Sequence, residues 1–220
     1  MAKINKAVDM CLNKMRAVGG TGKGVYGEQA VFKICEQIYQ KQGGMLFHSF
    51  SYKVDPSKAG NIKVSEQGNL MLENLGSSTE IDVLLVTPYR IFPIEVKAYK
   101  SKEIVLTDDR ISGCYKTDKS PIHQNEMHAR HLYASIFKCI PEGDTKYIVP
   151  ICCFVDECKI VDKRSDWQKT YIYKATLDNL YNTLTALNIP AEYRIDLQAV
   201  SRTLTEIEVS TSKKLPLIIR

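Results

Sequence analysis

Two apolar runs separated by a short turn constrain the fold of this 220-residue chain most strongly. Residues 81–86 read IDVLLV and residues 91–97 read IFPIEVK, so each run has the length of a β-strand. Near-continuous apolar strands are typical of a sheet that is covered on both faces. We therefore predict a hairpin inside a sheet with helices on its two sides. Because Pro93 has no N–H group, it predicts a bulge or a sheet edge at that point.

The register of this hairpin brings charged side chains together. A turn of two or four residues, centred within residues 87–90, places Asp82 opposite Glu95 and Glu80 opposite Lys97. Glu95 and Lys97 share one face of their strand, because strand side chains alternate. Two carboxylates about 5 Å apart repel each other and require a cation, either a lysine or a divalent ion such as Mg²⁺ or Mn²⁺. A salt-bridge cluster on a solvent-facing patch is the alternative interpretation of the same spacing.

Apolar periodicity predicts the remaining elements. The expected helices cover residues 3–17, 26–41, 120–137, 177–188 and 193–207. The expected further strands cover residues 46–54, 70–72, 102–106, 147–155 and 170–173. Ser120 is a favourable N-cap residue, and Pro121 suits the first position of the helix that follows. The fold class predicted is α/β, with a mixed central β-sheet flanked by helices and with helices at the C-terminal end.

The glycine-rich segment 19–24, GGTGKG, invites comparison with a phosphate-binding loop. A Walker A motif needs Gly where Ala17 stands and Ser or Thr where Gly24 stands, and it follows a strand rather than a helix. The sequence therefore predicts a flexible turn here.

Composition limits the classes of function without selecting one. A net charge of +5 suits a nucleic-acid partner. The seven cysteines include no CxxC pair, which argues against a zinc ribbon and favours reduced thiols. The first residues lack the apolar segment of a signal peptide, and no apolar run is long enough to span a bilayer. We therefore expect a cytoplasmic protein without membrane contact.

Five sequence pieces in order resemble the nuclease-related domain family, which is part of the PD-(D/E)xK, or restriction-endonuclease-like, superfamily. They are Gly27-Glu28, Thr79-Glu80-Ile81-Asp82, Ile94-Glu95-Val96-Lys97, Pro121-Ile122-His123-Gln124 and His128. The resemblance covers roughly residues 25–137, and the strand expected at 147–155 fits its continuation. Residues 108–116 lack the tryptophan that often follows the family's ExK strand.

The resemblance implies roles for the matching residues. The implied ligands of a Mg²⁺ or Mn²⁺ ion are Glu28, Asp82, Glu95 and the backbone carbonyl of Val96. Lys97 would orient or activate the attacking water and stabilise the charged transition state. Gln124 would lie beside the site, with His128 one helical turn further along the same face. The resemblance also divides the chain into an N-terminal helix and turn (1–24), a nuclease-like core (25–165) and a mainly helical extension packed on the core (166–220).

The predicted function is metal-dependent hydrolysis of phosphodiester bonds in nucleic acid, with DNA as the first candidate substrate and a homodimer as an open possibility. The main alternative is a nucleic-acid-binding module without catalysis. A zinc site built from His123, His128 and His131 is a second alternative. An iron–sulfur site that uses Cys152, Cys153 and Cys158 is a third, although this spacing fits no common cluster motif.

Overall fold

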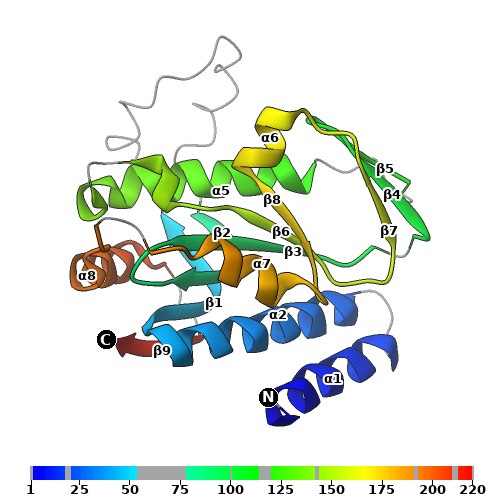
Figure 1. The fold of residues 1–220 in the computed structure, drawn as a ribbon, viewed down its shortest axis with the longest axis horizontal. Helices are drawn as coiled ribbons and strands as arrows, with labels where there is room; N and C mark the ends of the chain where they lie inside the picture. Colours follow the sequence, from blue (N-terminus) through cyan, green and yellow to red (C-terminus); the bar gives the residue numbers. More distant parts are fainter. Residues whose placement is uncertain are drawn as a thin grey trace.

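A six-stranded mixed sheet forms the centre of the molecule, in the order β8-β6-β3-β2-β1-β9 (Figure 1). The computed structural model describes residues 2–17, 21–53, 78–99, 101–113, 120–141, 144–190, 193–209 and 213–219. The strands are β1 (Gly44–Lys53), β2 (Ser78–Val86), β3 (Ile91–Lys97), β6 (Ile151–Phe154), β8 (Tyr173–Thr176) and β9 (Lys213–Ile218). Strands β3, β6 and β8 run parallel, whereas β2, β1 and β9 add antiparallel pairings.

Helices cover both faces of this sheet, which confirms the predicted α/β class (Figure 1). One face carries α2 (Thr21–Gln42) and α7 (Leu180–Leu187), with α1 (Ala2–Ala17) packed against α2. The other face carries α5 (Pro121–Ile136) and α8 (Leu197–Ile207). None of the helices described here is long and apolar enough to cross a membrane.

The apolar runs 81–86 and 91–97 fill both cores because neighbouring side chains point to opposite faces. Val83 and Leu85 belong to the core under α2, whereas Leu84 and Val86 belong to the core under α5 and α8. All four side chains are fully buried. The sheet therefore needs a helical layer on each side, as its sequence predicts.

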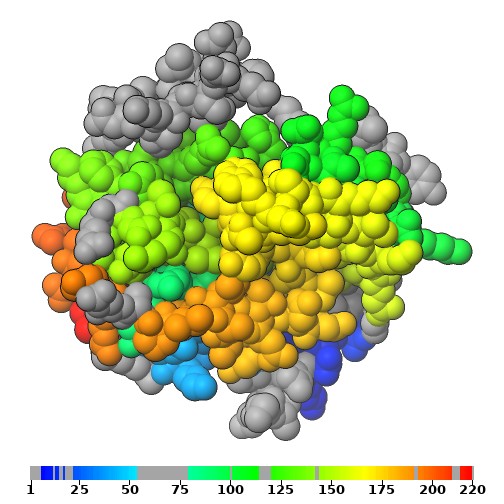
Figure 2. Space-filling model, turned by 45° about the horizontal axis from the view of Figure 1, so that its top comes forward, coloured from blue at the N-terminus to red at the C-terminus, as the bar shows by residue number. Residues whose placement is uncertain are grey.

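A smaller sheet lies beside the main one, in the order β5-β4-β7. Its strands are β4 (Glu103–Leu106), β5 (Ile111–Ser112) and β7 (Lys159–Asp162), followed by α6 (Asp166–Tyr171). The buried Arg164 joins the two sheets, because its guanidinium donates to Asp162 and to the carbonyl of Ile172 beside β8. Figure 2 shows α6 next to α5 on the surface.

The hairpin of β2 and β3 has the predicted register, with Val83 opposite Ile94 and Val86 opposite Ile91. The prediction of a bulge or a sheet edge at Pro93 is wrong. Strand β3 lies between β2 and β6, and Pro93 pairs regularly with Leu84. The carbonyl groups of Ile91 and Lys97 accept hydrogen bonds from the β6 side. Since backbone groups alternate along a strand, the missing N–H of Pro93 also faces β6, and the ladder with β2 loses nothing.

Four other local expectations change. Helix α2 begins at Thr21, so residues 21–24 are helical rather than a turn. The strand expected at 170–173 is β8, at Tyr173–Thr176, and helix α6 precedes it. The Ser120 side chain makes no capping hydrogen bond. The strand expected at 147–155 is shorter, since β6 starts at Ile151.

The C-terminal part of the chain contributes more than helices. Residues 166–220 supply the two outermost strands of the main sheet, β8 and β9, in addition to α6, α7 and α8. Strand β9 was not anticipated. The strand expected at residues 70–72 lies outside the described residues.

Candidate active site

Asp82 lies at a break in the main sheet. The ladder between β2 and β3 ends at the pair Val83–Ile94, one residue before Asp82 would face Glu95. The ladder between β1 and β2 also omits the position of Asp82, since it passes from His48–Val83 directly to Phe50–Ile81. At the break, the Asp82 carboxylate accepts a hydrogen bond of 2.7 Å from the N–H of Val96. Beyond this point β2 remains paired with β1 but no longer with β3.

Glu95 and Lys97 meet at this break, as the alternation along β3 predicts. The Lys97 ammonium lies 2.5 Å from Oε1 of Glu95, and Glu95 is only 1% exposed. Lys97 also donates to Oε1 of Gln124 on α5, at 3.2 Å. The predicted pairing of Glu80 with Lys97 is not observed, because the β2–β3 ladder ends at Val83–Ile94, and Glu80 accepts a hydrogen bond from Ser51 of β1. A lysine, two acids and a glutamine amide therefore converge from β2, β3 and α5.

Helix α2 brings Glu28 to the same region. Its negative charge acts on both Asp82 and Glu95. Glu28 Oε2 lies 3.5 Å from Nε2 of His48 on β1. The sequence analysis did not single out His48. The available signal was a polar side chain two residues after the buried Leu46, where strand alternation places both on one face.

His128 approaches the site from α5, one turn beyond Gln124. Its Nδ1 atom lies 3.5 Å from Oε2 of Glu95, and both side chains are buried. Burial, together with the nearby His131 and Lys97, lowers the pKa of His128 to about 4, so the imidazole is neutral at pH 7. A neutral imidazole cannot compensate the charge of Glu95.

The electrostatics of the cluster are unfavourable for two free carboxylates. Burial and the adjacent Glu95 raise the pKa of Asp82 to about 8, although the hydrogen bond from Val96 opposes this rise. Burial also raises the pKa of Glu95, against the attraction of Lys97. Burial alone would lower the pKa of Lys97, but Glu95 and Asp82 raise it overall, so its ammonium stays charged. A single lysine thus faces three acidic groups, which include Glu28.

The donor set at the break fits a divalent cation. Among the described residues, no three His, Cys, Asp or Glu side chains are already arranged as a metal-binding group. However, Oε2 of Glu95 is buried without a hydrogen-bond partner and is an oxygen ligand of the kind that Mg²⁺ and Mn²⁺ prefer. The N–H of Val96 points towards Asp82, and the carbonyl of the same strand residue points to the same side.

The alternative metal sites find no support in the geometry. His131 is close enough to lower the pKa of His128, but His128 faces Glu95 and His123 lies near Glu126, and no three such side chains among the described residues could hold a metal ion. Cys152 and Cys153 are neighbours on β6 and pack into different cores. Two side chains on opposite faces of a strand cannot share an iron–sulfur cluster.

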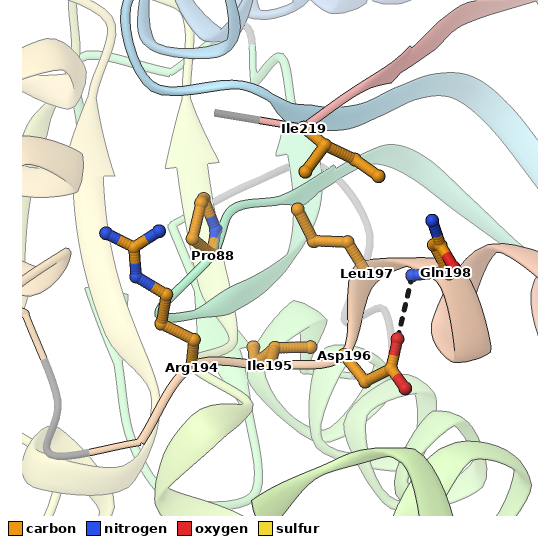
Figure 3. A pocket seen from close by; sticks show the side chains of 7 residues that line it. All are labelled: Pro88, Arg194, Ile195, Asp196, Leu197, Gln198 and Ile219. Carbon is orange, nitrogen blue, oxygen red and sulfur yellow. Dashed lines mark hydrogen bonds between the residues drawn. The ribbon is translucent and has the colours of Figure 1, made fainter.

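A surface pocket exists at the other end of the hairpin and does not include the acidic cluster (Figure 3). Pro88 lies in the turn between β2 and β3, and Ile219 follows β9. Asp196 accepts hydrogen bonds from the N–H groups of Gln198 and Ala199 at the start of α8. The Asp196 carboxylate thus caps the N-terminus of α8, so helix capping explains why this acidic side chain lies in the pocket.

Comparison with known proteins gives one match. The family model described as the nuclease-related domain matches residues 23–155, which is more than half of the chain. No curated protein and no solved structure matches. The matched range includes α2 from residue 23 onwards together with β1, β2, β3 and α5, so it contains every residue of the cluster described above.

Proposed function

The chain belongs to the nuclease-related domain family, and from this premise we propose that it is a metal-dependent nuclease. The proposed reaction is hydrolysis of phosphodiester bonds in nucleic acid, with DNA as the first substrate to test. The net charge of +5 suits such a polyanionic substrate.

One observation carries this proposal. Asp82, Glu95 and Lys97 converge where the β2–β3 ladder ends, and burial and mutual repulsion both disfavour the charged forms of the two acids there. A structural salt bridge would need one acid for one lysine. When Asp82 ionises, it and the nearby Glu28 add negative charge that Lys97 cannot neutralise, whereas a divalent ion can.

Each residue of the cluster has a proposed role. Asp82, Glu95 and the carbonyl of Val96 would hold a Mg²⁺ or Mn²⁺ ion, and Glu28 would complete its shell. Such an ion lowers the pKa of the attacking water and neutralises charge on the phosphate. The Lys97 ammonium orients the water and stabilises the charge that develops on the phosphate oxygens. Gln124 accepts a hydrogen bond from Lys97 and so fixes the direction of its ammonium group.

The test is cleavage of linear, circular and branched DNA by the purified protein with Mg²⁺ or Mn²⁺. Glu95→Gln keeps the shape of the side chain and removes its charge. The matched control is Glu103→Gln, which changes a carboxylate that pairs with the exposed Lys159 on the smaller sheet. Because metal ions contribute several kcal/mol to such reactions, we expect cleavage to fall about 1,000-fold in Glu95→Gln.

The results separate the nuclease from its main alternative. Cleavage by the wild type and by Glu103→Gln, but not by Glu95→Gln, supports the proposal. If the wild type binds DNA in a salt-dependent manner and cuts none of the substrates with either ion, the protein is a binding module and the proposal fails.

A further inference from the structure

His48 is a partly buried polar residue, with a side chain 19% exposed, that the family resemblance does not assign. It lies on β1, opposite Val83, and its ring packs edge-on against Phe32 of α2, with ring centroids 5.6 Å apart. Its Nε2 atom is buried and has no hydrogen-bond partner that meets normal geometry. A buried donor without a partner is destabilising, so its surroundings need an explanation.

Glu28 supplies that explanation. Its Oε2 atom lies 3.5 Å from Nε2 of His48, slightly beyond hydrogen-bond length. Hydrogen bonds at catalytic sites are often long before ligands bind and shorten afterwards. Glu28 and Phe32 are four residues apart on α2, so one helical face presents both to His48. Phe32 fixes the ring plane of His48, and the ring in turn directs Nε2 at Glu28.

The backbone next to His48 is shaped for this placement. Ser49 has a φ of 54°, the only positive φ of a residue other than glycine in the described chain. His48 faces α2, whereas Phe50 and Tyr52 stack on each other in the core on the opposite face. Strict alternation would put residues 48, 50 and 52 on one face. The left-handed conformation of Ser49 interrupts this alternation. Strand β1 can therefore direct His48 towards Glu28 and also direct Phe50 and Tyr52 into the core on the other face.

We propose that His48 is a positioning residue of the metal site, which holds the Glu28 carboxylate towards the ion bound by Asp82 and Glu95. This inference rests on the proposed function, because it assumes that an ion binds there. His48 acts on the ion through Glu28: Nε2 donates a hydrogen bond to one carboxylate oxygen and leaves the other oxygen for the ion. Partners of this kind set the orientation of metal ligands, and their loss weakens metal affinity.

The test is calorimetric binding of Mn²⁺ to the full chain, without nucleic acid. His48→Ala removes the donor. His48→Gln places an amide N–H about where Nε2 stood, whereas the shorter His48→Asn reaches only as far as Nδ1. We expect Mn²⁺ affinity about 10–100-fold weaker in His48→Ala and His48→Asn. Affinity in His48→Gln should stay within about threefold of the wild type. His123→Ala serves as the histidine control, because His123 is largely exposed and faces Glu126.

A double-mutant cycle separates positioning from packing. In a Glu28→Gln background, His48→Ala should cause no further loss of Mn²⁺ affinity, because the carboxylate that His48 positions is already removed. A loss that persists in that background, or an equal loss in His48→Gln and His48→Ala, overturns the role of His48. Wild-type affinity in His48→Ala also overturns it. If the wild type itself binds no Mn²⁺, the metal site fails and the positioning role fails with it.

Discussion

At the scale of single residues, the cluster contains two kinds of charge with different tasks. Asp82 and Glu95 are buried acids with raised pKa values, and they suit metal binding. Lys97 is partly exposed and contacts both Glu95 and Gln124, so it can reach a substrate. Variants of the acids and of the lysine should therefore differ in which property they lose.

Lys97→Met should separate metal binding from cleavage. The variant removes a positive charge next to the metal ligands, so Mn²⁺ should bind as tightly as in the wild type or more tightly. Cleavage should fall at least about 100-fold, because the group that directs proton transfer and stabilises charge is gone. Calorimetry and a cleavage assay measure the two properties. Lys159→Met is the control, since Lys159 is exposed and pairs only with Glu103 among the contacts described. Equal losses of binding and cleavage would contradict this division of roles.

Asp82 should make the metal-free protein less stable as pH rises. Its folded pKa of about 8 lies above the unfolded value of about 3.9, so the folded state binds the proton more tightly between these values. Stability in chelator should therefore decrease from about pH 4 to about pH 8. Asp82→Asn can still accept from Val96 but carries no charge, so its melting temperature at pH 8 should exceed that of the wild type.

The same melting curves provide a metal-dependent control. Mg²⁺ should raise the melting temperature of the wild type, because it binds only the folded state, and should have little effect on Asp82→Asn. If Asp82→Asn has a lower melting temperature than the wild type at pH 8 in chelator, Asp82 is a structural residue.

At the scale of elements, the site depends on how closely α2 approaches the end of β6. Gly27 lies one residue before Glu28, and a methyl group there would come within 2.8 Å of Val155. Val155 is buried, and its branched side chain is stiff, so it cannot move aside easily. The position of Glu28 thus depends on the preceding residue, Gly27, which has no side chain and lets α2 lie close to Val155.

Gly27→Ala should lower stability and metal affinity together. The gain in helix propensity is about 1 kcal/mol, but overpacking costs about 1–3 kcal/mol and displaces α2. Gly24→Ala is the matched control, because a methyl group there meets only Glu28 Oε1, at 4.0 Å. Urea unfolding and Mn²⁺ calorimetry measure both effects. A Gly27→Ala protein as stable as Gly24→Ala would show that α2 is not held at this contact.

Sequence reasoning succeeded where the determinants are local. The hairpin register follows from two apolar runs and a short turn, and the register in turn brings Asp82 close to Glu95. It failed where distant contacts decide. Gly22 and Gly24 are helical because α2 begins at Thr21, and Lys23 between them pairs with Asp156, 133 residues away. Strand β9 contains Pro216 and forms only by pairing with β1. Likewise, no local pattern shows that His48 faces Glu28.

At the scale of the whole molecule, the family match covers only part of what stabilises the fold. It ends at residue 155, whereas both outer strands and three helices lie beyond it. Helix α8 inserts Leu197, Val200 and Leu204 into the core under α5, against the strands that carry the site. The C-terminal part of the chain therefore supports the sheet without contributing to the acidic cluster.

Leu204→Ala should destabilise the protein and leave the chemistry intact. Leu204 is fully buried, so the substitution should lower the free energy of unfolding by about 2–5 kcal/mol. Thr205→Ala, on the exposed side of the same helix, should have little effect. Urea unfolding measures the stability, and Mn²⁺ affinity should equal that of the wild type in both variants. A large loss of affinity in folded Leu204→Ala would show that α8 takes part in the site.

The proposed nuclease requires a divalent ion where β2 and β3 separate, between Asp82 and Glu95. The most direct measurement is a crystal structure grown with Mn²⁺, with the ion located by its anomalous scattering. We predict one strong peak within coordination distance of both carboxylates and of the Val96 carbonyl. An anomalous map without a peak there, from crystals of a protein that cuts DNA in the same Mn²⁺ buffer, would contradict the account.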